Sequence, residues 1–155
     1  MAAVTIGAAA VYLGLTRYVV LVGQVVGDSM IPTLEPGARY AINRLAYRWQ
    51  TPARGEIVAF RIPSESDLIV KRIVALPGER IALRGGAVLV NGAVLPEPYL
   101  ASGTRTAAKR MGKAVHEVAA DCYFLLGDHR EDSVDSRVDG AVPKAWIVGR
   151  VASWK

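Results

Sequence analysis

A serine and a lysine stand at positions where they could form a catalytic pair. Ser29 lies in residues 27–34 (GDSMIPTL), between an apolar stretch and a turn that contains proline. Lys71 interrupts the apolar run 68–76, and in a strand it would share a face with the isoleucines two residues before and after it. On a buried face its amine would be neutral, and a neutral amine can act as general base toward a serine hydroxyl. Taken alone, each residue has a plainer interpretation, as a turn serine and as an edge-strand lysine that reaches water.

Carboxylates and arginines alternate in a third polar segment, residues 127–137 (GDHREDSVDSR). The spacing of an EF-hand, with its central glycine and terminal glutamate, is absent, so no metal site is expected. Because Arg130 and Arg137 stand among the acids, pairs of aspartate and arginine within the loop are the favoured prediction. A Ser-His-Asp triad through His129 and Asp128 competes with the serine and lysine pair, but an imidazole in so acidic a segment is expected to be merely solvated.

The chain that must position these residues has the length of one domain. It has 155 residues, of which 52% are hydrophobic and 21% charged, so a core can form and disorder is excluded. Separate cofactor and substrate domains do not fit this length. The net charge of +5 suits an anionic membrane surface or nucleic acid and identifies neither. The single cysteine, Cys122, cannot form an internal disulfide or a cysteine-based zinc site.

The N-terminal segment is strongly apolar. Residues 1–16 carry no charged side chain, and after Arg17 none appears before Asp28. Alanine and leucine favour a helix near 2–17, about 24 Å long against a hydrocarbon core of about 30 Å, whereas β-branched residues favour a strand near 18–27. A cleaved signal peptide would begin with basic residues, which are missing here. The segment is therefore interpreted as a membrane anchor, with a buried core helix as the alternative.

Beyond residue 27 the pattern is typical of antiparallel β structure, because short apolar runs alternate with proline and glycine turns. The dipeptide Asn91-Gly92 predicts a hairpin turn. Residues 101–120 hold four lysines and arginines with little periodicity and are interpreted as a solvated loop. The predicted strands are Glu56–Arg61, Leu68–Ala75, Arg80–Leu83, Ala87–Val90, Cys122–Leu126 and Ile147–Ser153.

In their order along the chain, the polar segments resemble the sequence boxes of the type I signal peptidases, membrane-anchored serine proteases that remove signal peptides from exported proteins. Residues 29–34 resemble the nucleophile box, 71–79 the lysine box and 127–137 the C-terminal box. Residues 54–60 (RGEIVAF) resemble the remaining box, where the family usually has aspartate in place of Glu56. With the apolar N-terminus, the resemblance covers nearly the whole chain.

The resemblance implies a mainly β fold. An antiparallel β-sheet catalytic domain would occupy residues 18–155, preceded by one transmembrane helix at 1–17. Because the region between the lysine box and the C-terminal box is short for the family, the accessory β domain of larger members would be reduced to a hairpin and loop at 80–121.

The resemblance also implies roles for single residues. Ser29 would be the nucleophile and Lys71 the general base, and Ser133 would hydrogen-bond to the Lys71 amine and orient it. No metal or cofactor would take part. The remaining matched positions would form a scaffold: Asp128, and a salt bridge between Asp135 and Arg137.

The substrate is expected to bind as an added strand beside the segments that precede Ser29 and Lys71. The Ser29 N–H is the expected oxyanion donor, because Gly27 stands where some members add a serine hydroxyl. His129 stands where the family usually has asparagine. Shallow apolar pockets would accept small residues such as those of an A-x-A cleavage site, with these candidate walls: Val26, Met30, Leu68 and Val70.

The implied partners are preprotein signal peptides and a lipid bilayer, without nucleic acid. The implied location is a single-pass cell-membrane protein whose catalytic domain lies outside the cytoplasm. A dedicated-substrate Ser-Lys peptidase of a conjugation or pilin-processing system is the main alternative, whereas a repressor-type relative would need a helix-turn-helix that nothing before Ser29 supplies. A non-enzymatic module is less favoured because it leaves the spacing of the boxes unexplained; it would contact anionic lipid through Arg39, Arg44, Arg48 and Arg54.

Overall fold

The computed structural model describes residues 19–112 and 114–153 of the chain, and within them the structure is almost entirely β. The predicted helix near 2–17 lies outside these residues. None of the helices that the described part contains is long and apolar enough to cross a membrane. The elements are β1 (Val20–Gln24), β2 (Arg39–Asn43), β3 (Ile57–Phe60), β4 (Ile69–Ala75), β5 (Arg80–Arg84), β6 (Ala87–Val90), β7 (Ala93–Val94), η1 (Lys109–Met111), β8 (His116–Glu117), β9 (Cys122–Leu126), α2 (Ser136–Asp139), β10 (Val142–Pro143), η2 (Lys144–Trp146) and β11 (Ile147–Ser153).

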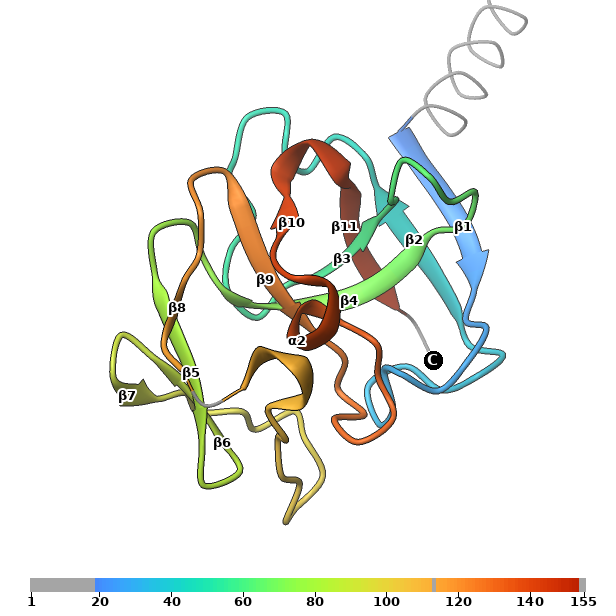
Figure 1. Cartoon of the computed structure of the whole chain (residues 1–155). Helices are drawn as coiled ribbons and strands as arrows, with labels where there is room; N and C mark the ends of the chain where they lie inside the picture. Colours follow the sequence, from blue (N-terminus) through green and yellow to red (C-terminus); the bar gives the residue numbers. More distant parts are fainter. Residues whose placement is uncertain (1–18, 113, 154–155) are drawn as a thin grey trace, which may run out of the picture.

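The larger of two sheets contains seven antiparallel strands in the order β1-β2-β11-β3-β4-β9-β10 (Figure 1). Strand β4 pairs with β3 along Ile69–Arg72, whereas its pairing with β9 begins only at Arg72. The edge of β4 over residues 69–71 that points away from β3 therefore has no strand partner within the described chain. This open edge carries Lys71.

Side chains on β4 alternate between two apolar clusters. Val70, together with the preceding Leu68, packs beside buried Met30 and Tyr40 on one face. On the other face Ile69 packs against a cluster that includes Phe60, Ile73 and Leu125. Lys71 belongs to this second face by its position, since successive residues of a strand point to opposite sides.

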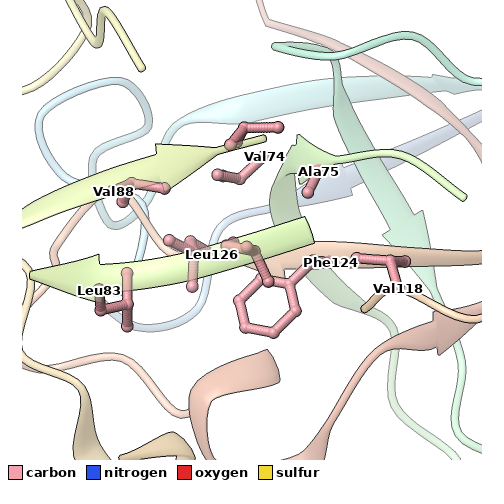
Figure 2. Close-up of a cluster of buried hydrophobic side chains, with 9 residues drawn as sticks. Val74, Ala75, Leu83, Val88, Val118, Phe124 and Leu126 are labelled. Atoms are coloured by element: carbon pink, nitrogen blue, oxygen red, sulfur yellow. The ribbon is translucent and has the colours of Figure 1, made fainter. Parts of the chain in front are cut away.

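A smaller sheet, in the order β7-β6-β5-β8, packs against the end of the larger one (Figure 1). Figure 2 shows the buried cluster between them: Leu83 of β5 and Val88 of β6 meet Val74 of β4 and the β9 residues Phe124 and Leu126. Because all five side chains are almost completely buried, the small sheet is fastened to the strands that carry the site. The segment 80–121, expected as a hairpin and loop, thus supplies a complete sheet of short strands.

The antiparallel β prediction is confirmed, with shifts of one residue at several strand ends. The hairpin at Asn91-Gly92 is confirmed as well: Val90 pairs with Ala93, and both turn residues have positive φ, the conformation that asparagine and glycine tolerate best. The predicted strand at 18–27 is shorter, at Val20–Gln24. Sequence reasoning missed β2, β8 and β10, because short strands next to charged residues are stabilised by their partners rather than by their own pattern.

Candidate active site

Ser29 and Lys71 come together although 42 residues separate them. Ser29 lies in the turn that follows β1, and Lys71 lies on the open edge of β4. Their Oγ and Nζ atoms are 2.6 Å apart, within hydrogen-bond distance. This is the distance at which an amine can take the proton of a hydroxyl as that hydroxyl attacks a carbonyl carbon.

The surroundings of Lys71 favour the neutral amine. The residue is 5% exposed, so the hypothesis of a buried face shared with Ile73 is confirmed, and the alternative of an edge-strand lysine that reaches water is wrong. Removal from water lowers the pKa of Lys71, and the nearby guanidinium of Arg137 acts in the same direction. The carboxylates of Asp135, Asp128 and Asp28 oppose this effect without cancelling it, so the net shift of the pKa is downward.

The turn that carries Ser29 is held against the segment 127–129. The backbone N–H of His129 donates a hydrogen bond to the Ser29 carbonyl at 3.0 Å. Gly127 packs so closely there that a Cβ atom would overlap Ser133 Oγ and lie 2.5 Å from the Ser29 carbonyl oxygen. Glycine at position 127 therefore allows the backbone of the nucleophile turn to rest directly on the C-terminal box.

Asp135 and Arg137 form the predicted salt bridge, and both side chains are completely buried. The Arg137 guanidinium donates to both Asp135 carboxylate oxygens, and the Gly127 N–H donates to the same carboxylate. Burial alone would raise the pKa of Asp135, but the hydrogen bond and charge of Arg137, with help from Gly127 and Ser133, bring it below its usual value. The ionised carboxylate braces the loop directly beside the dyad.

Ser133 is buried next to this pair, but its hydroxyl does not make the predicted hydrogen bond to Lys71. It donates weakly to the Val134 carbonyl at 3.5 Å, and it stabilises the Asp135 carboxylate. The predicted orientation of the Lys71 amine by Ser133 is therefore not seen in this structure, although Ser133 contributes to the lowered pKa of Asp135.

Asp128 is part of the scaffold, but its partner is not an arginine of its own loop. Both Asp128 oxygens accept hydrogen bonds from Arg72, at 2.8 and 2.6 Å, in the bidentate geometry that carboxylates and guanidinium groups favour. The guanidinium carbon of Arg72 also lies 3.9 Å from the centre of the Tyr99 ring, and Thr33 donates to Asp128. The clamp therefore fixes the residue that follows Lys71 to the loop that supports Ser29.

Arg130 likewise pairs outside its loop. Its guanidinium binds the Glu97 carboxylate and the Thr106 hydroxyl, which lie 33 and 24 residues before it in the sequence. The prediction of aspartate–arginine pairs within the loop is thus right for Asp135 with Arg137 and wrong for Asp128 and Arg130. Sequence patterns cannot rank these partners, since several residues of each charge are available to either group.

The region 101–120, predicted to be a solvated loop, instead supports the site. Thr106 is buried, and Lys109 donates from Nζ to the Ser133 carbonyl at 2.6 Å. The Arg137 guanidinium donates to the Ala107 carbonyl as well. Lys109 thus satisfies a backbone acceptor of the C-terminal box, and the Ala107 carbonyl accepts from an arginine of the box, so the region acts as a clasp over that box. Lys109, the clasp residue closest to the catalytic loop, carried no signal in the sequence beyond its charge.

A cavity of about 510 Å³ lies beside the dyad, between the end of β1 and the open edge of β4. Ser29 and Lys71 both line it, together with all four residues predicted as substrate walls: Val26, Met30, Leu68 and Val70. Met30 is buried, whereas Val26 is almost fully exposed, so the cavity is closed at its base and open at its rim. An extended chain entering this space would meet unpaired strand edges, which is the geometry of β-strand addition.

His129 lies close to Asp28 rather than in bulk water. Its Nδ1 atom is 3.9 Å from the Asp28 carboxylate and, though shielded from solvent, has no hydrogen-bond partner among the described residues. The predicted alternative of a Ser-His-Asp triad is disfavoured, because Asp128 is engaged by Arg72. Asp28, His129 and Asp132 bring possible ligand atoms within 4.8 Å of one another and form the one group in the described chain that could hold a metal ion.

Comparison with known proteins places these observations in a family. The family model "Signal peptidase, peptidase S26" matches residues 1–154. A signal peptidase I of Leptolyngbya laminosa is 36% identical, and the alignment covers 94% of this chain and 74% of that protein. A probable signal peptidase I-2 of Synechocystis is also 36% identical, with coverage of 89% and 64%.

The fold is similar to that of a solved signal peptidase I from Enterococcus faecalis. The two structures align with a TM-score of 0.55 and 29% sequence identity, over 65% of this chain and 97% of the other. The similarity therefore extends over about two thirds of this chain.

Proposed function

Because this chain belongs to the signal peptidase family, peptidase S26, we propose that Ser29 and Lys71 carry out its serine endopeptidase reaction, the removal of N-terminal signal peptides from exported preproteins. The family match establishes the enzyme class and favours a signal peptidase I over a dedicated peptidase of a conjugation or pilin-processing system. The observation that carries the catalytic assignment is the distance of 2.6 Å between Ser29 Oγ and Lys71 Nζ at a buried site.

The reaction begins when the neutral Lys71 amine takes the proton of the Ser29 hydroxyl as Oγ attacks the scissile carbonyl. The oxyanion of the tetrahedral intermediate accepts a hydrogen bond from the Ser29 N–H, for which the described chain offers no other acceptor. The Lys71 ammonium then donates its proton to the leaving amine, and the mature protein departs from an acyl-enzyme on Ser29. A water molecule, deprotonated by Lys71, hydrolyses this ester and restores both side chains.

The substrate pairs with the open edge of β4 as an added strand. The cavity lined by Met30, Leu68 and Val70 takes the side chain at the scissile bond, and its closed base favours a small residue such as alanine. The salt bridge of Asp135 with Arg137 and the clamp of Arg72 on Asp128 hold the two catalytic side chains in their relative positions.

Residues 1–17 act in this proposal as a single membrane anchor, with residues 18–155 as the catalytic domain. An apolar segment of this length lies ahead of β1, so the domain begins directly after the anchor. The preprotein would then present its cleavage site beside the bilayer, on the extracytoplasmic side.

The proposal is tested by cleavage of a preprotein with an A-x-A site. We expect Ser29→Ala and Lys71→Ala each to reduce kcat by roughly 10⁴-fold or more, because the members of a catalytic dyad act as a unit. The matched control is Lys144→Ala, which removes a lysine remote from the site and should leave the rate unchanged. Substantial cleavage by the Lys71 variant would contradict the assignment of Lys71 as general base.

A further inference from the structure

A second cavity, of about 430 Å³, also reaches the dyad but opens on the other face of β4. Ser29 and Lys71 line this cavity and the first one alike, so the two cavities flank the reacting atoms. We call it the second-face cavity. Val26, Gly27 and Ile69 line both cavities as well. The walls that only the second-face cavity has come from β3 and the segment after it, β9, the loop before α2, α2 and the segment that precedes β11.

The open edge of β4 determines which substrate side chains could enter each cavity. Leu68 and Val70 point to the first cavity, whereas Ile69 and Lys71 belong to the opposite face with Phe60 and Leu125. A peptide added to this edge continues the same alternation, because successive side chains of a strand lie on opposite faces of the sheet. If the residue before the scissile bond (P1) occupies the first cavity, the residue before it (P2) faces the second-face cavity.

The walls of the second-face cavity indicate what it would bind. Phe60, Leu125 and Trp146 form an apolar interior large enough for a long side chain. Two exposed carboxylates, Glu65 and Asp139, also line it, and neither forms an ion pair within the described residues. This is a local excess of negative charge on a chain whose net charge is +5.

We propose that the second-face cavity is a binding subsite for a large P2 side chain of the substrate, and that it favours a long basic side chain over an acidic one. This inference rests on the proposed function, since it names a substrate feature for the same dyad. The enzyme would then select cleavage sites that have a small residue at P1, and it would accept a large residue at P2.

The experiment uses the full chain in detergent micelles and four peptides that have alanine at P1 and P3 and differ at P2: alanine, leucine, lysine or glutamate. Burial of the additional carbon atoms should raise kcat/KM for leucine roughly tenfold over alanine. Contact with the two carboxylates should raise kcat/KM for lysine about fivefold over glutamate. Equal rates for all four peptides would overturn the subsite.

Two variants connect the effect to the cavity. In the double variant Glu65→Gln with Asp139→Asn, the ratio of lysine to glutamate should fall to about one, since only the charge attraction is removed. Glu117→Gln, which removes an exposed carboxylate from β8 of the small sheet, should keep the ratio of the original chain. An unchanged ratio in the double variant would contradict the assignment of these two carboxylates.

The same peptides separate failure of the subsite from failure of the proposed function. If the alanine peptide is cleaved by the original chain and not by Ser29→Ala, the proposed function holds whatever the P2 dependence is. A second peptide series varies only the residue after the scissile bond. If this residue changes the rate and the P2 side chain does not, the cavity serves the leaving segment and the P2 assignment is wrong.

Discussion

At the scale of single residues, Lys71 shows how a fold prepares a base. Its amine is taken out of water by the strand that carries it, and this loss of hydration is the largest cause of its lowered pKa. Three carboxylates close by would by themselves stabilise the ammonium form, yet their combined effect is smaller. The fraction of Lys71 that is protonated at neutral pH is therefore lower than for a lysine in water, and the pH dependence of cleavage should reflect this.

The pH dependence of cleavage follows from the direction of this shift. Below the pKa of Lys71 the amine is protonated and cannot accept the Ser29 proton, so kcat/KM should rise with pH as Lys71 loses its proton and then level off. Because the pKa is lower than that of a free lysine, the rise should come at lower pH than the usual titration of lysine. The measurement is a profile of kcat/KM for one peptide against pH.

A variant checks that Lys71 is the group that titrates. Asp28 is one of the carboxylates that raise the pKa of Lys71, and it is partly exposed. Asp28→Asn removes a negative charge without a large change of shape, so the rising limb should move to lower pH. If the rising part of the pH profile stays in place or moves to higher pH, the group that titrates is not Lys71.

At the scale of elements, the loop between β9 and α2 positions Ser29, just as β4 positions Lys71. The loop supplies the glycine on which the nucleophile turn rests and the buried Asp135, whose partner Arg137 lies in α2. Burial of two charges is unfavourable by itself, and the pair is stable because Gly127 and Ala107 complete its hydrogen bonds. Removal of one partner leaves the other charge buried and unpaired.

Asp135→Asn should therefore reduce the free energy of unfolding by about 3–5 kcal/mol, because the Arg137 charge would remain in the interior. The matched control is Arg150→Gln, which breaks the pair with Glu56 at the surface. The Arg150 side chain is 48% exposed, so this change should amount to less than about 1 kcal/mol. Both values come from urea denaturation of the full chain in detergent, and similar losses for the two variants would refute the role of burial.

At the scale of the whole molecule, two sheets and one long excursion enclose a site that opens at a strand edge. The small sheet is fastened through Leu83, Val88 and Phe124 (Figure 2). The excursion between β7 and β8 clasps the C-terminal box through Lys109. The region between β4 and β9 thus stabilises the catalytic loop from outside the dyad, through its contacts with the C-terminal box.

The proposed anchor can be tested at this scale. In a variant that lacks residues 1–17, the membrane-bound fraction should decrease by about tenfold or more. The reason is that burial of the apolar segment in lipid holds the chain on the membrane. Its cleavage of a short soluble peptide should persist, because Ser29 and Lys71 lie in the β structure. The measurement is sedimentation with membranes, followed by peptide cleavage in both fractions. Full retention of the truncated chain on the membrane would assign the attachment to the surface of the domain.

The sequence by itself determined the local elements and the candidate pair. Alternating apolar residues and turn dipeptides mark strands because their period and their backbone preferences are local properties. The same period indicates that Lys71 enters the interior if the face of Ile69 and Ile73 is the buried one, and it leaves the edge-strand alternative open. The pairing of Lys71 with Ser29 came from the resemblance of their boxes. These signals require no knowledge of what lies opposite in space.

The tertiary structure alone decided which groups meet across the fold. Asp128 binds Arg72, Arg130 binds Glu97, and the Ser133 hydroxyl donates to the Val134 carbonyl rather than to Lys71. Several acids and bases of similar strength could have formed each of these pairs, so residue type does not select among them. The selection comes from the path of the loops and from burial, because a charge in the interior must be matched by whichever partner the packing of distant segments brings within reach.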